Sequence, residues 1–240
     1  MPLRRLLAAG LLALPLAVQA GVQAQDYRAF WLWAGVRPQV LPADTRTLYL
    51  LQGEVLARHG QPARLHARQS GLPPLQVPEV WLVYRAETLD WPPLVHAQLN
   101  ARLLRWRQSG RPLTGVQIDF DAPTRRLSDY AAFLAGLRRQ LPADCRLGVT
   151  GLLDWSQADP ADLNALAQVV DEVVLQTYQG RSTLADYQDY LARVQRLQLP
   201  FRIGLVQGGV WQPRHDPARS PHFRGYVVFL QNQRVSTQLP

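Results

Sequence analysis

Eight short apolar runs recur along the chain, and each has the length and composition of a buried β-strand. They span residues 29–36, 47–53, 80–86, 115–121, 146–152, 172–178, 202–207 and 225–230. The runs are rich in Val, Leu, Ile and aromatic residues, which is typical of strands that are buried on both faces. The pattern therefore predicts eight strands that contribute to one core.

Apolar residues with helical spacing separate several of these runs. After the fourth run they recur from Leu127 to Leu141, and Pro142 then ends the predicted helix. Similar spacing predicts helices over residues 94–108, 161–169 and 184–197. Strand and helix thus alternate through the middle of the chain, which favours a parallel barrel over an open doubly wound sheet.

Two segments depart from this alternation. Residues 58–78 and 212–223 are rich in Pro, Gly, His and Arg, where a regular barrel would have crossover helices. We expect a hairpin or an irregular excursion in the first segment and a long loop in the second. The predicted fold class is α/β, a small and partly irregular TIM-like (β/α)8 barrel.

The beginning of the chain has the pattern of an export signal. Arg4 and Arg5 precede an apolar run over residues 6–18, and small residues suited to a signal peptidase follow. We interpret residues 1–24 as a signal peptide and residues 25–240 as a single domain, either periplasmic or secreted. The apolar run is short for a membrane span, so we expect no stable span after processing, and an uncleaved anchor is the alternative.

Charge and cysteine content exclude two classes of protein. The formal net charge is +8, but the arginines are scattered and form no dense basic stripe with stacking aromatic residues, so we do not expect a nucleic-acid partner. Cys145 is the only cysteine, so an exported chain of this kind is not held together by internal disulfides. We interpret Cys145 as a small buried residue.

The fourth apolar run carries polar side chains at every second position, namely Gln117, Asp119 and Asp121. Successive strand residues face opposite sides, so these three side chains share one face. Burying two carboxylates without partners is costly, so we expect them at the mouth of a solvated pocket, with Asp121 nearest the rim. A structural Asp pair that caps the next turn is the alternative.

The same segment resembles the fourth-strand motif of glycoside hydrolase family 18, the chitinase-like barrels. Residues 114–123 read Thr-Gly-Val-Gln-Ile-Asp-Phe-Asp-Ala-Pro, against the family pattern Asp-Gly-x-Asp-x-Asp-x-Glu followed by an aromatic residue and Pro. Asp119 matches the Asp two places before the family's catalytic acid, and Asp121 stands where the family has that Glu. Tyr178, with Gln176 two places earlier, falls on the family's substrate-contacting Tyr. The resemblance implies a barrel that acts on carbohydrate.

The chain is also similar, over nearly all of its predicted mature part, to an uncharacterised bacterial family, domain of unknown function family 3142. The similarity rests on Phe-Trp-Leu-Trp at 30–33, Gln-Ile-Asp-Phe-Asp-Ala-Pro-Thr at 117–124 and Val-Val-Leu-Gln-Thr-Tyr at 173–178. It implies an exported barrel without an established activity.

Residues at or near the predicted strand ends are candidates for saccharide binding: Gln117, Gln176, Tyr178, Trp31, Trp33, Gln52 and Asp154. Trp31 and Trp33 lie two positions apart and therefore face the same side of the predicted strand, where they could stack against sugar rings or pack in the core. Asp119, Asp121 and Asp154 could converge on a metal ion, but no His joins them at ligand spacing. We therefore predict neither a metal site nor a cofactor.

Together these patterns predict a carbohydrate-active protein of the cell envelope, with a carbohydrate polymer or oligosaccharide as its partner. In a possible hydrolase, Asp121 protonates the glycosidic oxygen and Asp119 tunes its pKa or stabilises positive charge. Tyr178 and Gln176 would position the sugar. The two carboxyl groups are compatible with retention or inversion, and the sequence assigns no oligomeric state. Two alternatives are a non-catalytic saccharide-binding protein and an envelope interaction protein.

Overall fold

The computed structural model describes residues 21–33, 35–36, 40–68, 76–194 and 196–232. Most of the predicted signal peptide, residues 1–20, lies outside the described residues. No helix in the described ranges combines the length and the apolar character needed to cross a membrane.

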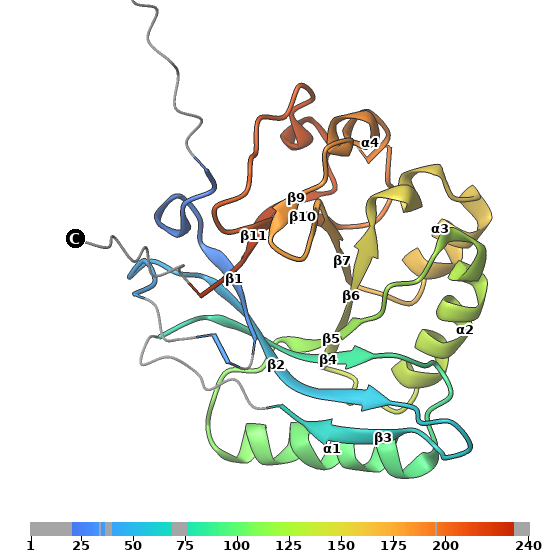
Figure 1. Ribbon diagram of the computed structural model, residues 1–240. Helices are drawn as coiled ribbons and strands as arrows, with labels where there is room; N and C mark the ends of the chain where they lie inside the picture. Colours follow the sequence, from blue (N-terminus) through green and yellow to red (C-terminus); the bar gives the residue numbers. More distant parts are fainter. Residues whose placement is uncertain (1–20, 34, 37–39, 69–75, 195, 233–240) are drawn as a thin grey trace, which may run out of the picture.

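Eight parallel strands close into a barrel (Figure 1). They are β1 (Ala29–Leu32), β2 (Thr47–Leu56), β4 (Glu79–Ala86), β5 (Gly115–Asp119), β6 (Arg146–Leu152), β7 (Glu172–Gln176), β10 (Phe201–Val206) and β11 (Phe223–Phe229). Each of these strands pairs with the next one along the chain, and β11 pairs with β1 to close the circle. The eight predicted strands and the predicted TIM-like α/β barrel are confirmed.

Four α-helices fill the connections in the middle of the chain. They are α1 (Pro93–Gln108), α2 (Leu127–Arg138), α3 (Pro160–Ala167) and α4 (Tyr187–Val194), and they follow β4, β5, β6 and β7. The helix α3 begins where the Asp159 carboxylate accepts a hydrogen bond from the N–H of Ala161 at 2.8 Å, which satisfies one of the helix's free donors. All four predicted helices form, although α4 is shorter than its apolar pattern indicated.

The remaining connections carry no α-helix in the described residues. A short antiparallel strand, β3 (Arg64–Ala67), pairs with the last four residues of β2 and forms a hairpin, one of the two alternatives expected for residues 58–78. The predicted loop over residues 212–223 contains only the 3-10 helix η4 (Pro217–Arg219). The helices consequently surround only part of the barrel (Figure 1).

The barrel interior is filled by large aromatic side chains. The ring of Tyr49 stacks on Trp81 at 5.8 Å between centroids, and Trp31 lies 5.7 Å from Tyr49. Glycines on other strands make room for these indoles, because a Cβ at Gly204 on β10 would come within 2.8 Å of the Trp31 ring. The interior is therefore a packed layer, and any opening must lie beyond the strand ends.

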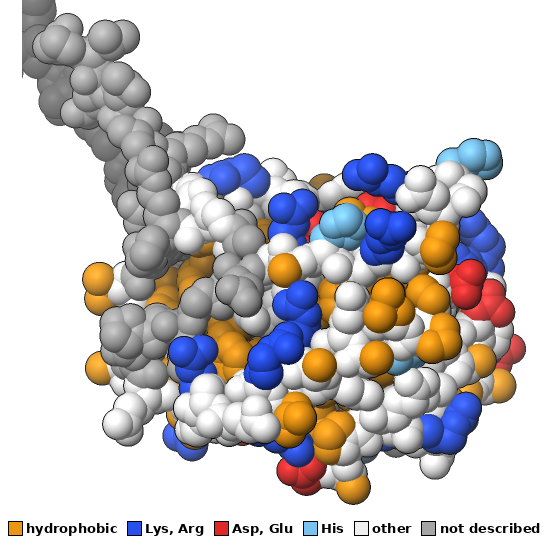
Figure 2. Space-filling view, turned by 90° about the horizontal axis from the view of Figure 1, so that it is seen from below, with side chains coloured by type: hydrophobic (Ala, Val, Ile, Leu, Met, Phe, Trp, Pro, Cys, Tyr) orange, Lys and Arg blue, Asp and Glu red, His pale blue; other side chains and the backbone are white. Residues whose placement is uncertain are grey.

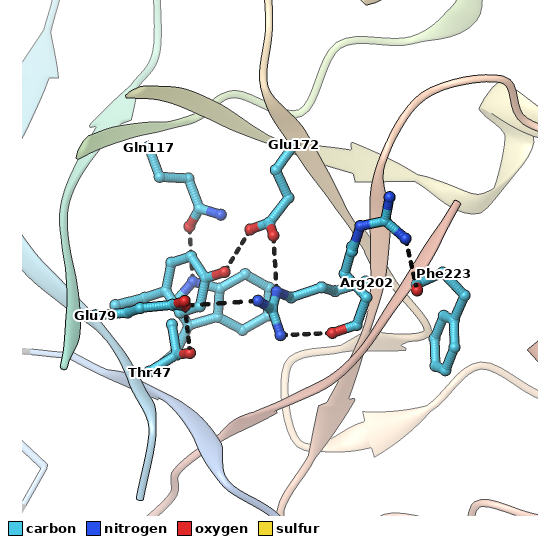
Figure 3. A network of polar contacts seen from close by, with 9 residues as sticks. Thr47, Glu79, Gln117, Glu172, Arg202 and Phe223 are labelled. Atoms are coloured by element: carbon cyan, nitrogen blue, oxygen red, sulfur yellow. Dashed lines mark hydrogen bonds and ion pairs between the residues drawn. The ribbon is translucent and has the colours of Figure 1, made fainter. Parts of the chain in front are cut away.

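A charged network closes the end of the barrel at which the strands begin (Figure 3). The Arg202 guanidinium lies 2.7 Å from Glu172 and 3.7 Å from Glu79. The Tyr49 hydroxyl donates to the other oxygen of Glu172, and the Thr47 hydroxyl donates to Glu79 at 2.8 Å. Glu172 is only 2% exposed, so these partners offset the cost of burying its charge.

The chain carries a formal net charge of +8. Figure 2 shows arginine side chains spread over the face that it presents, interspersed with apolar and uncharged side chains. Cys145 is buried, as predicted. The functional chemistry is therefore to be found at the other end of the barrel, where the strands finish.

Candidate active site

A cavity of about 680 Å³ opens at the carboxyl ends of the barrel strands. It is lined by Trp33, Arg85, Asp119, Asp121, Leu152, Leu153, Asp154, Gln176, Tyr178, Gln179, Gly180, Leu184, Asp186, Tyr190 and Phe229. These residues come from the ends of five barrel strands, from the short strand β8 (Tyr178–Gln179), from connecting segments and from α4. This is the end at which parallel barrels carry their ligand sites.

Asp119 is the most deeply buried carboxyl group of the cavity. It is the last residue of β5 and is 6% exposed. The Thr150 hydroxyl donates to its Oδ1 at 2.8 Å, and the Gln176 amide donates to the same oxygen at 3.4 Å. Burial raises the pKa of Asp119 to about 6; the hydrogen bonds from Thr150 and Gln176 oppose this rise.

Asp121 lies two residues further along, beyond the end of β5. Its side chain is 62% exposed, and its Oδ2 is 4.0 Å from the Arg85 guanidinium. Arg85 reaches this position because its place in β4 is directly opposite Asp119 in the parallel pair of strands. The negative charge of Asp121 also raises the pKa of Asp119. The structure thus places two predicted carboxyl groups in one cavity but in different environments.

Three aromatic rings form one wall of the cavity. Tyr178 stacks on Phe229 at 5.6 Å, and Trp33 meets Phe229 edge-on at 5.5 Å. The Arg85 guanidinium lies 5.5 Å from the centre of the Trp33 ring. Burial raises the pKa of Tyr178 well above its ordinary value, so the hydroxyl keeps its proton and can donate a hydrogen bond. Such a wall suits the apolar face of a sugar ring.

Asp154 joins the cavity from the loop after β6, within the 3-10 helix η3 (Leu153–Gln157). Burial raises its pKa, while backbone hydrogen bonds oppose the rise. Its buried Oδ1 accepts no hydrogen bond from the described residues. Within those residues, no three His, Cys, Asp or Glu side chains are grouped so that they could hold a metal ion.

Three of the predicted binding residues do not line the cavity. The indole N–H of Trp31 donates to Oε1 of Gln117 at 2.7 Å, and both side chains are buried inside the barrel. This bond satisfies the indole N–H of Trp31 in the packed layer beneath Asp119, while the Gln117 amide nitrogen has no hydrogen-bond partner among the described residues. Gln52 is 7% exposed and lies at a shift in the register between β2 and β4, with its amide donating to the backbone oxygen of Leu51.

Several residues of the site were not among the predictions. Thr150 was one polar residue within the apolar run 146–152, and Phe229 was the next-to-last residue of the run 225–230. A polar side chain inside a strand that is otherwise apolar was the signal that identified Asp119, and it also applied to Thr150. Leu184 and Asp186 reach the cavity from the loop before α4, and Tyr190 reaches it from α4 itself. The strand pattern of the sequence does not indicate these positions.

Fold and cavity together define a TIM-like barrel with an acidic, aromatic-walled site. A family model described as domain of unknown function (DUF3142) matches residues 86–209, just over half of the chain, and this chain belongs to that family. The matched region includes Asp119, Asp121 and Tyr178.

One similar solved structure is the crystal structure of the Bacillus cereus spore cortex-lytic enzyme SleL. The two chains are 16% identical with a TM-score of 0.43, and the match covers 68% of this chain and 45% of that one. The present chain therefore corresponds to less than half of that structure. No curated protein matches the chain.

Proposed function

We propose that this protein hydrolyses glycosidic bonds, using Asp119 and Asp121 as its paired carboxyl groups. The observation that carries the proposal is the contrast between these two groups within one cavity. Asp119 is buried with a pKa of about 6, whereas Asp121 is largely exposed beside Arg85. A pair of carboxyl groups in different environments is the arrangement that separates proton donor from charged partner in glycosidases.

The burial of Asp119 favours it as the proton donor. A carboxyl group with a pKa near 6 holds its proton in mildly acidic solution, which suits general acid catalysis. Its proton passes to the glycosidic oxygen as the bond from that oxygen to the sugar carbon breaks. Water supplies the hydroxyl group to that carbon and returns a proton to the enzyme. This assignment reverses the roles that the family resemblance implied for Asp119 and Asp121.

Asp121 then acts as the charged carboxylate. Its position in the same cavity as Asp119 allows it to stabilise the positive charge that develops on the sugar or to orient the attacking water. Trp33, Tyr178 and Phe229 would receive the faces of sugar rings, and the Gln176 amide would bind a sugar hydroxyl. Because the sequence begins with the pattern of an export signal, we propose that the substrate is a carbohydrate of the cell envelope or its surroundings.

The test is a hydrolysis screen of the purified protein against envelope and amino-sugar polymers, with new reducing ends as the readout. Loss of a general acid lowers rates by about 10² to 10⁴ fold, so Asp119→Asn should lose nearly all activity. Asp129→Asn, which neutralises an exposed carboxylate on α2 outside the cavity, is the matched control. Cleavage that survives in both Asp119→Asn and Asp121→Asn would refute the proposal.

A non-catalytic saccharide-binding protein is the second candidate. It is favoured by the exposure of Asp121, which lies 4.0 Å from Arg85 and is one methylene shorter than the Glu of the glycoside hydrolase family 18 motif that the sequence resembles. In that case calorimetry detects binding of an oligosaccharide, and product analysis finds the same oligosaccharide intact. Turnover of any bound oligosaccharide decides for the enzyme.

A further inference from the structure

The charge of the cavity is opposite to the charge of the chain. The formal net charge of the protein is +8, yet the described cavity wall holds four aspartates and one arginine. The aspartates are Asp119, Asp121, Asp154 and Asp186, and the arginine is Arg85. A concave wall with low-dielectric surroundings concentrates such a field, so the cavity attracts cations although the net charge of the chain is positive.

The single arginine does not cancel this charge. Its guanidinium faces Asp121 at 4.0 Å and lies over the Trp33 ring at 5.5 Å. Arg85 carries one positive charge, which lies near Asp121 and also lowers the pKa of Asp119, so it offsets at most one carboxylate charge of the lining. With Asp119 protonated, as a proton donor must be, the lining still holds three aspartates, Asp121, Asp154 and Asp186, against one arginine.

Asp154 supplies an independent indication of a cationic ligand. It lines the cavity, and its buried Oδ1 accepts no hydrogen bond from the described residues. A carboxylate oxygen that is buried without a partner is stabilised strongly by a positive group at hydrogen-bond distance.

We propose that the ligand of this cavity is an amino sugar whose amine is not acetylated and is therefore protonated. The proposal rests on the proposed function, because it specifies which carbohydrate the cavity accepts. The aromatic wall of Trp33, Tyr178 and Phe229 receives the sugar ring, and the carboxylates receive its ammonium group. Acidic saccharides are repelled from the same surface.

The experiment compares three probes of equal length by calorimetry: glucosamine oligomers, N-acetylglucosamine oligomers and oligogalacturonate. The glucosamine oligomer should bind at least about tenfold more tightly than its acetylated counterpart, with an affinity that falls as salt is added. Oligogalacturonate should not bind. Equal or tighter binding of the acetylated oligomer, or binding of oligogalacturonate, overturns the inference.

Two variants link the preference to the cavity. Asp186→Asn removes one carboxylate of the lining and should weaken glucosamine-oligomer binding about threefold without changing binding of the acetylated oligomer. Asp189→Asn makes the same change on α4 outside the lining and should alter neither. An unchanged affinity for the glucosamine oligomer in Asp186→Asn also overturns the inference. Thermal unfolding verifies that both variants are folded.

The outcomes separate this inference from the proposed function. Binding or cleavage of acetylated oligomers without a preference for the amine removes the inference and leaves the glycosidase proposal intact. If none of the saccharides binds and none is cleaved, both fail together.

Discussion

The Thr150 hydroxyl donates a hydrogen bond to Oδ1 of Asp119 at 2.8 Å, across the neighbouring strands β6 and β5. Thr150 is 3% exposed, so this bond lies in a region without competing water. It stabilises the charged form of Asp119 and opposes the effect of burial on its pKa. A residue on the next strand therefore makes the central carboxyl group more acidic than its burial alone would.

Replacement of Thr150 tests that relationship. Thr150→Val removes the hydroxyl and keeps the shape, so the pKa of Asp119 should rise above its value of about 6. Thr150→Ser keeps the hydroxyl and should leave the pKa close to that of the parent protein. NMR titration of the Asp119 carboxyl carbon measures both; a pKa that is the same in the Val and Ser variants would contradict the assigned bond.

Asp119→Asn should change the dependence of stability on pH. The folded-state pKa of about 6 lies above the ordinary value of 3.8, so Asp119 contributes stability that is complete below that ordinary value. This contribution is lost as pH rises through about 6, and its size is about 3 kcal/mol. The variant has no such loss.

Urea unfolding of both proteins from about pH 4 to about pH 8 measures this difference. Over that interval, the free energy of unfolding of Asp119→Asn should increase relative to that of the parent protein by up to about 3 kcal/mol. A difference in the free energy of unfolding that is constant with pH, or that moves the other way, would show that Asp119 is not a buried carboxyl group with a raised pKa.

The charged network at the other end of the barrel should matter for stability. Arg202→Met leaves Glu172 buried without its ion-pair partner and should lower the free energy of unfolding by about 3 to 5 kcal/mol. Arg224→Met makes the same substitution at an exposed position on β11 and should have a much smaller effect. Similar losses in both variants would mean that the buried pair makes no special contribution.

Trp31 and Trp33 should behave differently although they share one segment. Trp33 lies on the cavity wall, so Trp33→Ala should weaken saccharide binding by about three- to tenfold, the range of one aromatic contact, with little loss of stability. Trp31 fills the barrel interior, so Trp31→Ala should destabilise the protein by about 3 to 5 kcal/mol. Calorimetry measures saccharide binding by both variants, and urea unfolding measures their stability. If both variants are well folded and lose saccharide binding equally, the different roles of Trp31 and Trp33 are contradicted.

The strands of the barrel were predictable because each is buried on both faces and therefore has a continuous apolar sequence. The acidic residues of the site were predictable for the complementary reason. Asp119 and Asp121 interrupt such a run at its carboxyl end, where parallel barrels open. Both line the cavity together with Tyr178, Gln176, Asp154 and Trp33.

The sequence indicated that Gln117 lies deeper than Asp119, but it did not show which of these depths the cavity reaches. Gln117 has the same parity as Asp119 but lies one layer deeper, where it meets Trp31. Gln52 lies at a register shift that the alternation of its strand does not reveal. These positions depend on the stagger of neighbouring strands and on which side chains fill the interior, which are properties of the assembled barrel.

The dependence of hydrolysis rate on pH, measured for the parent protein and for Asp119→Asn, tests the central claim most directly. If Asp119 is the proton donor, the rate of the parent protein at low substrate concentration falls as pH rises through about 6, and Asp119→Asn is nearly inactive throughout. A rate that increases through that interval, or cleavage by Asp119→Asn at the rate of the parent protein, would contradict it.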